Sequence, residues 1–241
     1  ALLRTQGAMA IPVDCYPVDN DEPLYTNTYW SYGQINLRAA TQVRKTDGIY
    51  SVWCSNYACG PDSFNLHFYQ FIMYGKPYAI IETDGHSGDA GTKTRIEAFL
   101  HCVHEFEMGA PIRQPQNLHA LENENIPLME ANKRGAAILI PYLGDNSQIL
   151  AAGFASIGIN CVALPIATRR TLLLGRRHTS GKECLPALIT LGALLEYVED
   201  HPNEKIVFFM PRSNGPCRLG CYNLLDKMVL QRLGLSDRVS V

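Results

Sequence analysis

Lys205-Ile-Val-Phe-Phe-Met210 is a short apolar run, and Pro211-Arg-Ser-Asn-Gly-Pro-Cys217-Arg-Leu-Gly-Cys221-Tyr-Asn223 follows it directly. The first run predicts a buried strand, and the periodic apolar positions of 219–233 predict a helix. A Gly-Pro pair turns the chain between them, so Cys217 falls at or near the first turn of that helix. Free backbone N–H groups and the helix dipole favour a thiolate there, which makes Cys217 a candidate metal ligand or nucleophile.

The same arrangement occurs once more upstream. Tyr50-Ser-Val-Trp-Cys54 predicts a strand, the following Ser-Asn-Tyr-Ala-Cys59-Gly a turn, and the chain from Pro61 a helix. Both cysteine-bearing turns then follow the carboxyl ends of strands. Open parallel sheets bind their ligands at such ends.

Apolar runs alternate with helical patterns along the whole chain, and the runs are continuous, as is typical of parallel strands covered on both faces. We expect an α/β fold of two doubly wound, Rossmann- or flavodoxin-like units whose mostly parallel sheets face a shared cleft. Residues 1–130 form the unit that carries Cys59, and residues 131–241 form the unit that carries Cys184 and Cys217. Further strands are expected at 8–13, Tyr78–Glu82, 136–141 and 160–164, with 111–127 a linker and 168–181 a connection.

Composition excludes several classes of partner. The net charge of −2 gives no sign of binding to nucleic acid or to an anionic membrane. No apolar run approaches the roughly 20 residues of a spanning helix, and the start lacks a signal-peptide pattern. Eight cysteines without a secretory signal indicate reduced thiols in an oxygen-poor cytoplasm. Because the chain opens on Ala1 and stops within an incipient strand, we expect an excerpt of a longer polypeptide, and its oligomeric state is open.

Three cysteines are the candidates for one metal centre: Cys59, Cys184 and Cys217. Each lies beside Gly or Pro or near a predicted helix start, and Cys184 follows Thr179 and Ser180, either of which could cap its helix. Taken singly, each could equally be a small residue that fills a tight turn. Their wide spacing is unlike a zinc finger and suits an iron–sulfur cluster, which accepts scattered thiolates.

The other thiols have less specific settings. Cys54 is expected in the core, and Cys221, one helical turn after Cys217, is either a further ligand or a core thiol. Cys102 and Cys161 lie in apolar, regular segments and are expected as core thiols.

A polar loop between a predicted strand and helix is the other unusual stretch, Glu82-Thr-Asp-Gly-His86-Ser-Gly-Asp89-Ala-Gly91. His86 or Glu82 could move protons there, with the helix N-terminus holding an anion. Equally, the aspartates could make turns while Arg95 and Glu97 form ion pairs. No nucleotide-binding glycine motif is present. A basic patch, Arg169-Arg170 with Arg176-Arg177-His178, is either solvated surface or a contact for phosphates or an acidic partner.

Several blocks in order resemble one family. They are 56–64 around Cys59, 82–99 around His86, 181–186 around Cys184, and 208–218 around Cys217. Together they are similar to the acyl-CoA dehydratase activase-related proteins, whose cysteine-bearing part resembles the subunits of 2-hydroxyacyl-CoA dehydratase and benzoyl-CoA reductase. Gly85 departs from the acid expected before the histidine, and Cys221 is additional.

The resemblance implies an oxygen-sensitive protein whose [4Fe–4S] cluster, or pair of joined cubanes, is held by Cys59, Cys184 and Cys217. It also implies an ATP-hydrolysing activator as electron donor and an acyl-CoA or other small molecule as substrate. The leading hypothesis is therefore an iron–sulfur electron-transfer or reductase module. The alternatives are a non-catalytic scaffold with a structural metal or free thiols, and a thiol enzyme with Cys217 as nucleophile.

Overall fold

The computed structural model describes residues 2–84, 88–109 and 116–241. The chain divides into two compact units, residues 1–119 and 120–241, with the boundary inside helix α5 (Leu118–Asn123). The boundary expected at 130/131 falls instead inside α6 (Leu128–Lys133) of the second unit.

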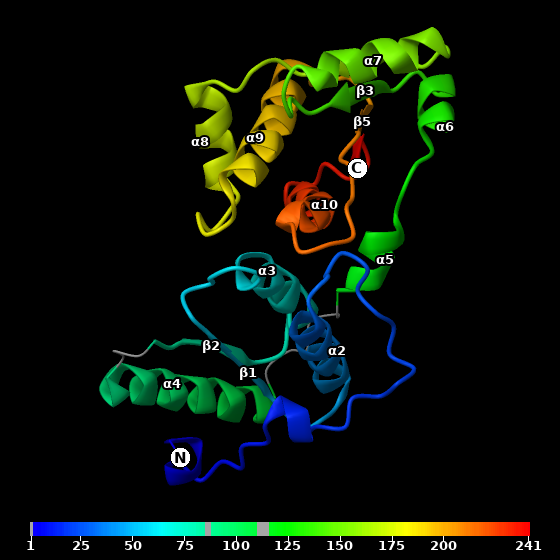
Figure 1. Ribbon diagram of the computed structural model, residues 1–241. Coiled ribbons are helices and arrows are strands. Elements are labelled where there is room, and N and C mark those ends of the chain that lie inside the picture. The colour runs from blue at the N-terminus through cyan, green and yellow to red at the C-terminus, as the bar shows by residue number, and fades with distance from the viewer. Residues whose placement is uncertain (1, 85–87, 110–115) are drawn as a thin grey trace. The chain divides into compact units, whose positions relative to one another are not determined.

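The first unit is a mixed α/β unit with a two-stranded parallel sheet (Figure 1). Strand β1 (Ser51–Ser55) pairs with β2 (Tyr78–Glu82) over their full lengths. The helices are α1 (Leu2–Thr5), α2 (Ser31–Lys45), α3 (Asp62–Ile72) and α4 (Asp89–Glu107), with a short 3-10 helix, η1 (Val13–Cys15). Helix α3 connects β1 to β2, which is the crossover that two parallel strands require.

Helix α3 is the centre of the first unit's core because apolar residues occupy almost its whole circumference. Phe64, Phe68 and Tyr69 are fully buried, and the Tyr69 ring packs against Trp53 of β1. Helix α2 contributes one apolar face to the same core, with buried residues Leu37, Ala40 and Val43 spaced as a helical stripe. The apolar spacing of residues 29–45 predicts the helix α2, and the apolar run after Pro61 predicts α3; the structure confirms both.

The second unit contains a four-stranded parallel sheet in the order β4-β3-β5-β6. Its strands are β3 (Ala137–Ile140), β4 (Cys161–Ala163), β5 (Ile206–Phe208) and β6 (Val239–Ser240). Its helices, beyond α5 and α6, are α7 (Asn146–Ser156), α8 (Arg169–Arg177), α9 (Leu185–Asp200) and α10 (Tyr222–Arg232), and the 3-10 helix η2 (Arg218–Cys221) precedes α10. All pairings among the described strands of both units are parallel, as expected from their continuous apolar runs.

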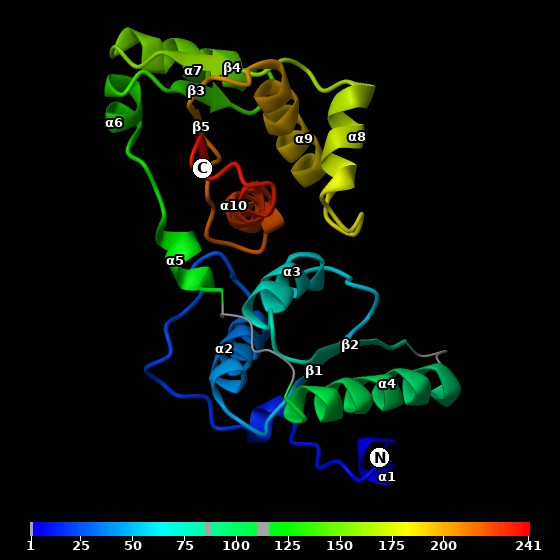
Figure 2. The same cartoon turned by 180° about the vertical axis from the view of Figure 1, so that it is seen from behind.

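Helices α8 and α9 lie side by side in both views of the molecule (Figures 1 and 2). A glycine on each helix allows this close approach. A Cβ atom at Gly175 of α8 would overlap the carbonyl oxygen of Leu188, and a Cβ atom at Gly192 of α9 would overlap that of Thr171. The backbones therefore touch where any larger residue would separate them.

Helix α7 is unusual because it is apolar and yet largely exposed. Ser147 is its buried residue, whereas Ile149 is 70% exposed and Ile157, the residue after its end, is 66% exposed. The stretch 146–168 contains no charged residue. No helix within the described ranges is both long and apolar enough to cross a bilayer.

The structure corrects several sequence-based expectations. Residues 8–13 form no strand; the chain there leads into η1. The expected linker at 111–127 contains α5 in its described part, and the expected connection at 168–181 contains α8. Cys54 and Cys102, which were expected in the core, are exposed, because their side chains lie on element faces that the core does not cover. Cys161 is half-buried and packs against the core cluster of Ala131, Ile138, Ile159 and Val207, in keeping with its expected place.

Candidate functional site

Three cysteines of the second unit each stand at the start of a helix. Cys184 is the N-cap residue of α9, Cys217 that of η2 and Cys221 that of α10. Cys184 and Cys217 have extended backbones that turn directly into their helices, as the sequence predicted. Each cysteine therefore precedes backbone N–H groups that have no partner within the helix, although neither sulfur accepts a capping hydrogen bond.

The three thiols also act on one another electrostatically. Burial chiefly, together with the charges of Cys184 and Cys217, raises the pKa of the Cys221 thiol to about 12, and the charge of Arg218 acts in the opposite direction. Cys221 is buried, Cys184 is half-buried and Cys217 is exposed. Thus Cys221 is a buried thiol, whereas the other two are more accessible.

Tyr222 joins this group through its phenol. Its hydroxyl oxygen lies 2.7 Å from the Cys184 sulfur, within hydrogen-bond distance. Burial, the hydrogen bond to Cys184 and the charges of Cys184 and Cys217 all raise the pKa of Tyr222. Sequence reasoning missed this residue because the contact joins side chains 38 positions apart.

The turn that carries Cys217 is packed tightly against its own helix start. A Cβ atom at Gly220 would come 2.5 Å from the carbonyl oxygen of Ser213. Gly220 is therefore the residue that lets the loop after β5 fold back onto η2. This local packing fixes the place of the turn between Cys217 and Cys221.

The donor set of the second unit is chemically suited to a thiophilic group. The charges of Cys184, Cys217 and Arg218 all act on Cys221, so two accessible thiols, a buried thiol and an arginine lie within electrostatic range of one another. Across the described ranges, no three His, Cys, Asp or Glu side chains come close enough to hold one metal ion. A cubane binds each thiolate through a different iron, so its ligands stand further apart than those of a single ion.

In the first unit, Cys59 lies in a turn with an uncommon backbone. Tyr57, Ala58 and Gly60 have φ angles of 50°, 56° and 59°, in the left-handed region that disfavours residues with a Cβ atom. The Ser55 Oγ accepts a hydrogen bond from Ala58 N–H at 3.1 Å. Cys59 itself is exposed and precedes α3 by a short Gly-Pro step.

Glu82 lies beside this turn, because β1 and β2 are paired and both end there. Its carboxylate accepts a hydrogen bond from Tyr57 N–H, which ties the end of β2 to the strained turn. This contact gives Glu82 a positioning role next to Cys59. His86, the other candidate for proton transfer, lies outside the described residues.

The remaining sequence candidates lie on helices. Arg170 of α8 pairs with Glu196, Glu199 and Asp200 of α9, and hydrogen bonds to Asp200 and Glu199 raise the pKa of Arg170. The arginine patch thus includes one residue that links two helices. Glu97 lies 3.9 Å from Lys93 on α4, an exposed pair of ordinary i,i+4 spacing.

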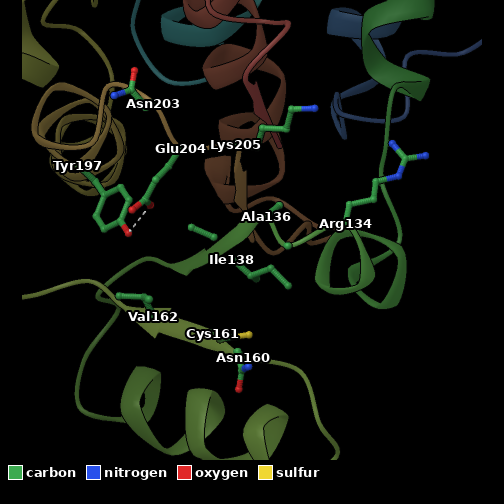
Figure 3. Close-up of a pocket in the computed structure, with 12 residues that line it drawn as sticks. Arg134, Ala136, Ile138, Asn160, Cys161, Val162, Tyr197, Asn203, Glu204 and Lys205 are labelled. Carbon is green, nitrogen blue, oxygen red and sulfur yellow. Dashed lines mark hydrogen bonds between the residues drawn. The ribbon is translucent and has the colours of Figure 1, made fainter.

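An open hollow of about 590 Å³ lies at the amino ends of β3, β4 and β5 (Figure 3). Arg134, Lys205 and Cys161 are among its lining residues, and Tyr197 bonds Glu204 at its side. Cys217 follows the opposite, carboxyl end of β5. The hollow therefore contains none of the ligand candidates.

Comparison with protein-family models, with curated proteins and with solved structures finds no match to this chain. The resemblance to the dehydratase activase-related family accordingly rests on the sequence blocks alone.

Proposed function

We propose that this chain is an iron–sulfur electron-transfer or reductase module of the 2-hydroxyacyl-CoA dehydratase type, with Cys59, Cys184 and Cys217 as ligands. The observation that carries the proposal is the gathering of Cys184, Cys217 and Cys221 at helix starts of one unit. The strained turn around Cys59 supports its inclusion, because such strain costs about 1–3 kcal/mol per residue and is concentrated at functional sites.

A bound [4Fe–4S] cluster or pair of joined cubanes would supply one-electron transfer at low potential. The chain's own residues would hold and orient it. Cys184 and Cys217 are the N-cap residues of α9 and η2, where the positive end of a helix dipole favours negative charge on a ligand sulfur. Glu82 would keep the Cys59 turn in place through Tyr57 N–H.

The proposed partners are an ATP-hydrolysing activator as electron donor and an acyl-CoA or another small molecule as acceptor. The proposed setting is an oxygen-poor cytoplasm, since none of the eight cysteines, all of which the structure describes, forms a disulfide. Each parallel sheet is proposed to belong to a doubly wound unit. His86 remains the proposed proton carrier.

Anaerobic reconstitution with iron and sulfide tests the proposal. The wild-type chain should become brown, with iron and sulfide near cubane stoichiometry, and give an electron paramagnetic resonance signal on reduction. Cys217→Ser should lose most of the iron because a ligand sulfur is removed. The matched control is Cys102→Ser, which alters an exposed thiol on α4 outside the ligand set and should retain full iron.

A colourless wild-type protein without iron after reconstitution would refute the module. Zinc alone, unaffected by reductant, would instead favour a scaffold with a structural metal.

A further inference from the structure

Tyr222 is placed to act on the proposed centre without being one of its ligands. It is the first residue of α10, directly after Cys221, and is 3% exposed. Its hydroxyl lies 2.7 Å from the sulfur of Cys184, the N-cap residue of α9. The contact therefore joins the starts of two helices, and the packing of both helices into the core of the second unit fixes it.

The direction of this hydrogen bond follows from the protonation of the sulfur. Between a thiol and a phenol, either group could donate. A cysteine that binds iron is a thiolate and has no proton, so the tyrosine must donate. A donor to a ligand sulfur withdraws electron density from it and stabilises the more negative, reduced state of a cluster.

We propose that Tyr222 is a positioning residue that donates its phenolic hydrogen bond to the Cys184 sulfur and thereby raises the reduction potential of the bound cluster. This inference rests on the proposed function and adds to it the residue that tunes the site.

The experiment compares Tyr222→Phe with a matched control, Tyr197→Phe. Tyr197 lies on α9 of the same unit, and its hydroxyl bonds Glu204 at 3.0 Å, so the control removes one phenolic hydrogen bond elsewhere. Each variant is reconstituted anaerobically, and its iron and sulfide are counted. Its reduction potential is then measured by titration monitored with electron paramagnetic resonance.

We expect both variants to retain the iron of the wild type. Tyr222→Phe alone should shift the potential to a more negative value. Its iron–sulfur stretching frequencies in resonance Raman spectra should rise, because the bonds strengthen when the sulfur is no longer a hydrogen-bond acceptor. A shift of the same size in Tyr197→Phe would overturn the assignment.

A second substitution tests the direction of the shift in reduction potential while it keeps the phenol and nearly the same side-chain volume. Replacing Tyr222 by 3-fluorotyrosine makes the phenol a stronger donor and should shift the potential to a more positive value. If Tyr222→Phe does not fold, the 3-fluorotyrosine variant is the decisive test, and a reduction potential equal to that of the wild type overturns the inference.

The outcomes separate the inference from the function on which it depends. Full iron with identical potentials in all variants overturns the role of Tyr222 and leaves the iron–sulfur module standing. A Tyr222→Phe chain that folds but loses its iron also overturns the inference, because Tyr222 is then needed for cluster assembly and does not only set the reduction potential. A wild-type chain without iron overturns both.

Discussion

Asp226 is a carboxyl group that the fold of the second unit buries completely on α10. Its Oδ2 atom has no hydrogen-bond partner within the described chain, and burial raises its pKa well above 3.8. The folded state therefore binds this proton more tightly than the unfolded state does. The contribution of protonated Asp226 to stability is therefore fully present below the pKa that Asp226 has in the unfolded chain. It is lost as the pH rises through the higher pKa that Asp226 has in the folded chain.

Asp226→Asn should accordingly stabilise the chain at pH 7.5 by about 1–3 kcal/mol, because the amide cannot ionise. At pH 4 the difference should be small. Urea unfolding of both proteins at the two pH values measures this, and Asp237→Asn, at an exposed position, is the control. A constant difference between wild type and variant across that range would contradict the prediction.

For single residues, the sequence predicted correctly those positions that are determined by neighbouring residues in the chain. Cys184 and Cys217 stand at helix starts because Gly, Pro and capping residues beside them already determine the turns. It could not identify Tyr222 or Asp226, whose roles depend on burial by distant segments. Cys54 and Cys102 were assigned wrongly to the core, since an apolar neighbourhood in sequence does not decide which face of an element is covered.

The α8–α9 pair is the contact between elements that tolerates substitution least. Gly192→Ala would place a methyl group on the carbonyl oxygen of Thr171, so one helix must move. We expect a loss of about 1–3 kcal/mol in the free energy of unfolding, as is usual for overpacking. Thermal and urea unfolding followed by circular dichroism measure it.

Gly153→Ala is the control for that substitution, because nothing lies within 4 Å of a Cβ atom there. It should instead stabilise α7 by about 0.5–1 kcal/mol through higher helix propensity. If Gly192→Ala and Gly153→Ala changed the free energy of unfolding equally, helix propensity rather than the contact with Thr171 would determine the effect.

Element prediction succeeded where the pattern was long and periodic, as in α2, in α3 and in α9, which the apolar pattern of residues 183–199 predicts. Helix α8 was missed because its three consecutive leucines have no helical period and arginines stand on both sides. It folds as a helix because Thr168 caps it and Thr171, Leu174 and Gly175 pack against α9. That stabilisation comes from a partner helix, which no local pattern reveals.

In solution, we expect the exposed apolar side chains on and directly after α7 to promote self-association. Replacing both Ile149 and Ile157 by Lys should change the unfolding free energy by no more than about 0.5 kcal/mol, because both are exposed. It should nevertheless lower the binding of a hydrophobic dye and the light scattering at high concentration. Gln148→Lys adds charge without removing an apolar side chain and should leave dye binding unchanged.

The strand order β4-β3-β5-β6 has a consequence for biosynthesis. Strand β3 can pair with β4 soon after both leave the ribosome, yet its other edge stays open until α8 and α9 have been translated and β5 emerges. During that interval the nascent chain presents an unpaired edge beside apolar segments, which is the condition under which chaperones engage. Slow translation through the α8–α9 region would prolong that vulnerable interval, whereas rapid arrival of β5 would end it.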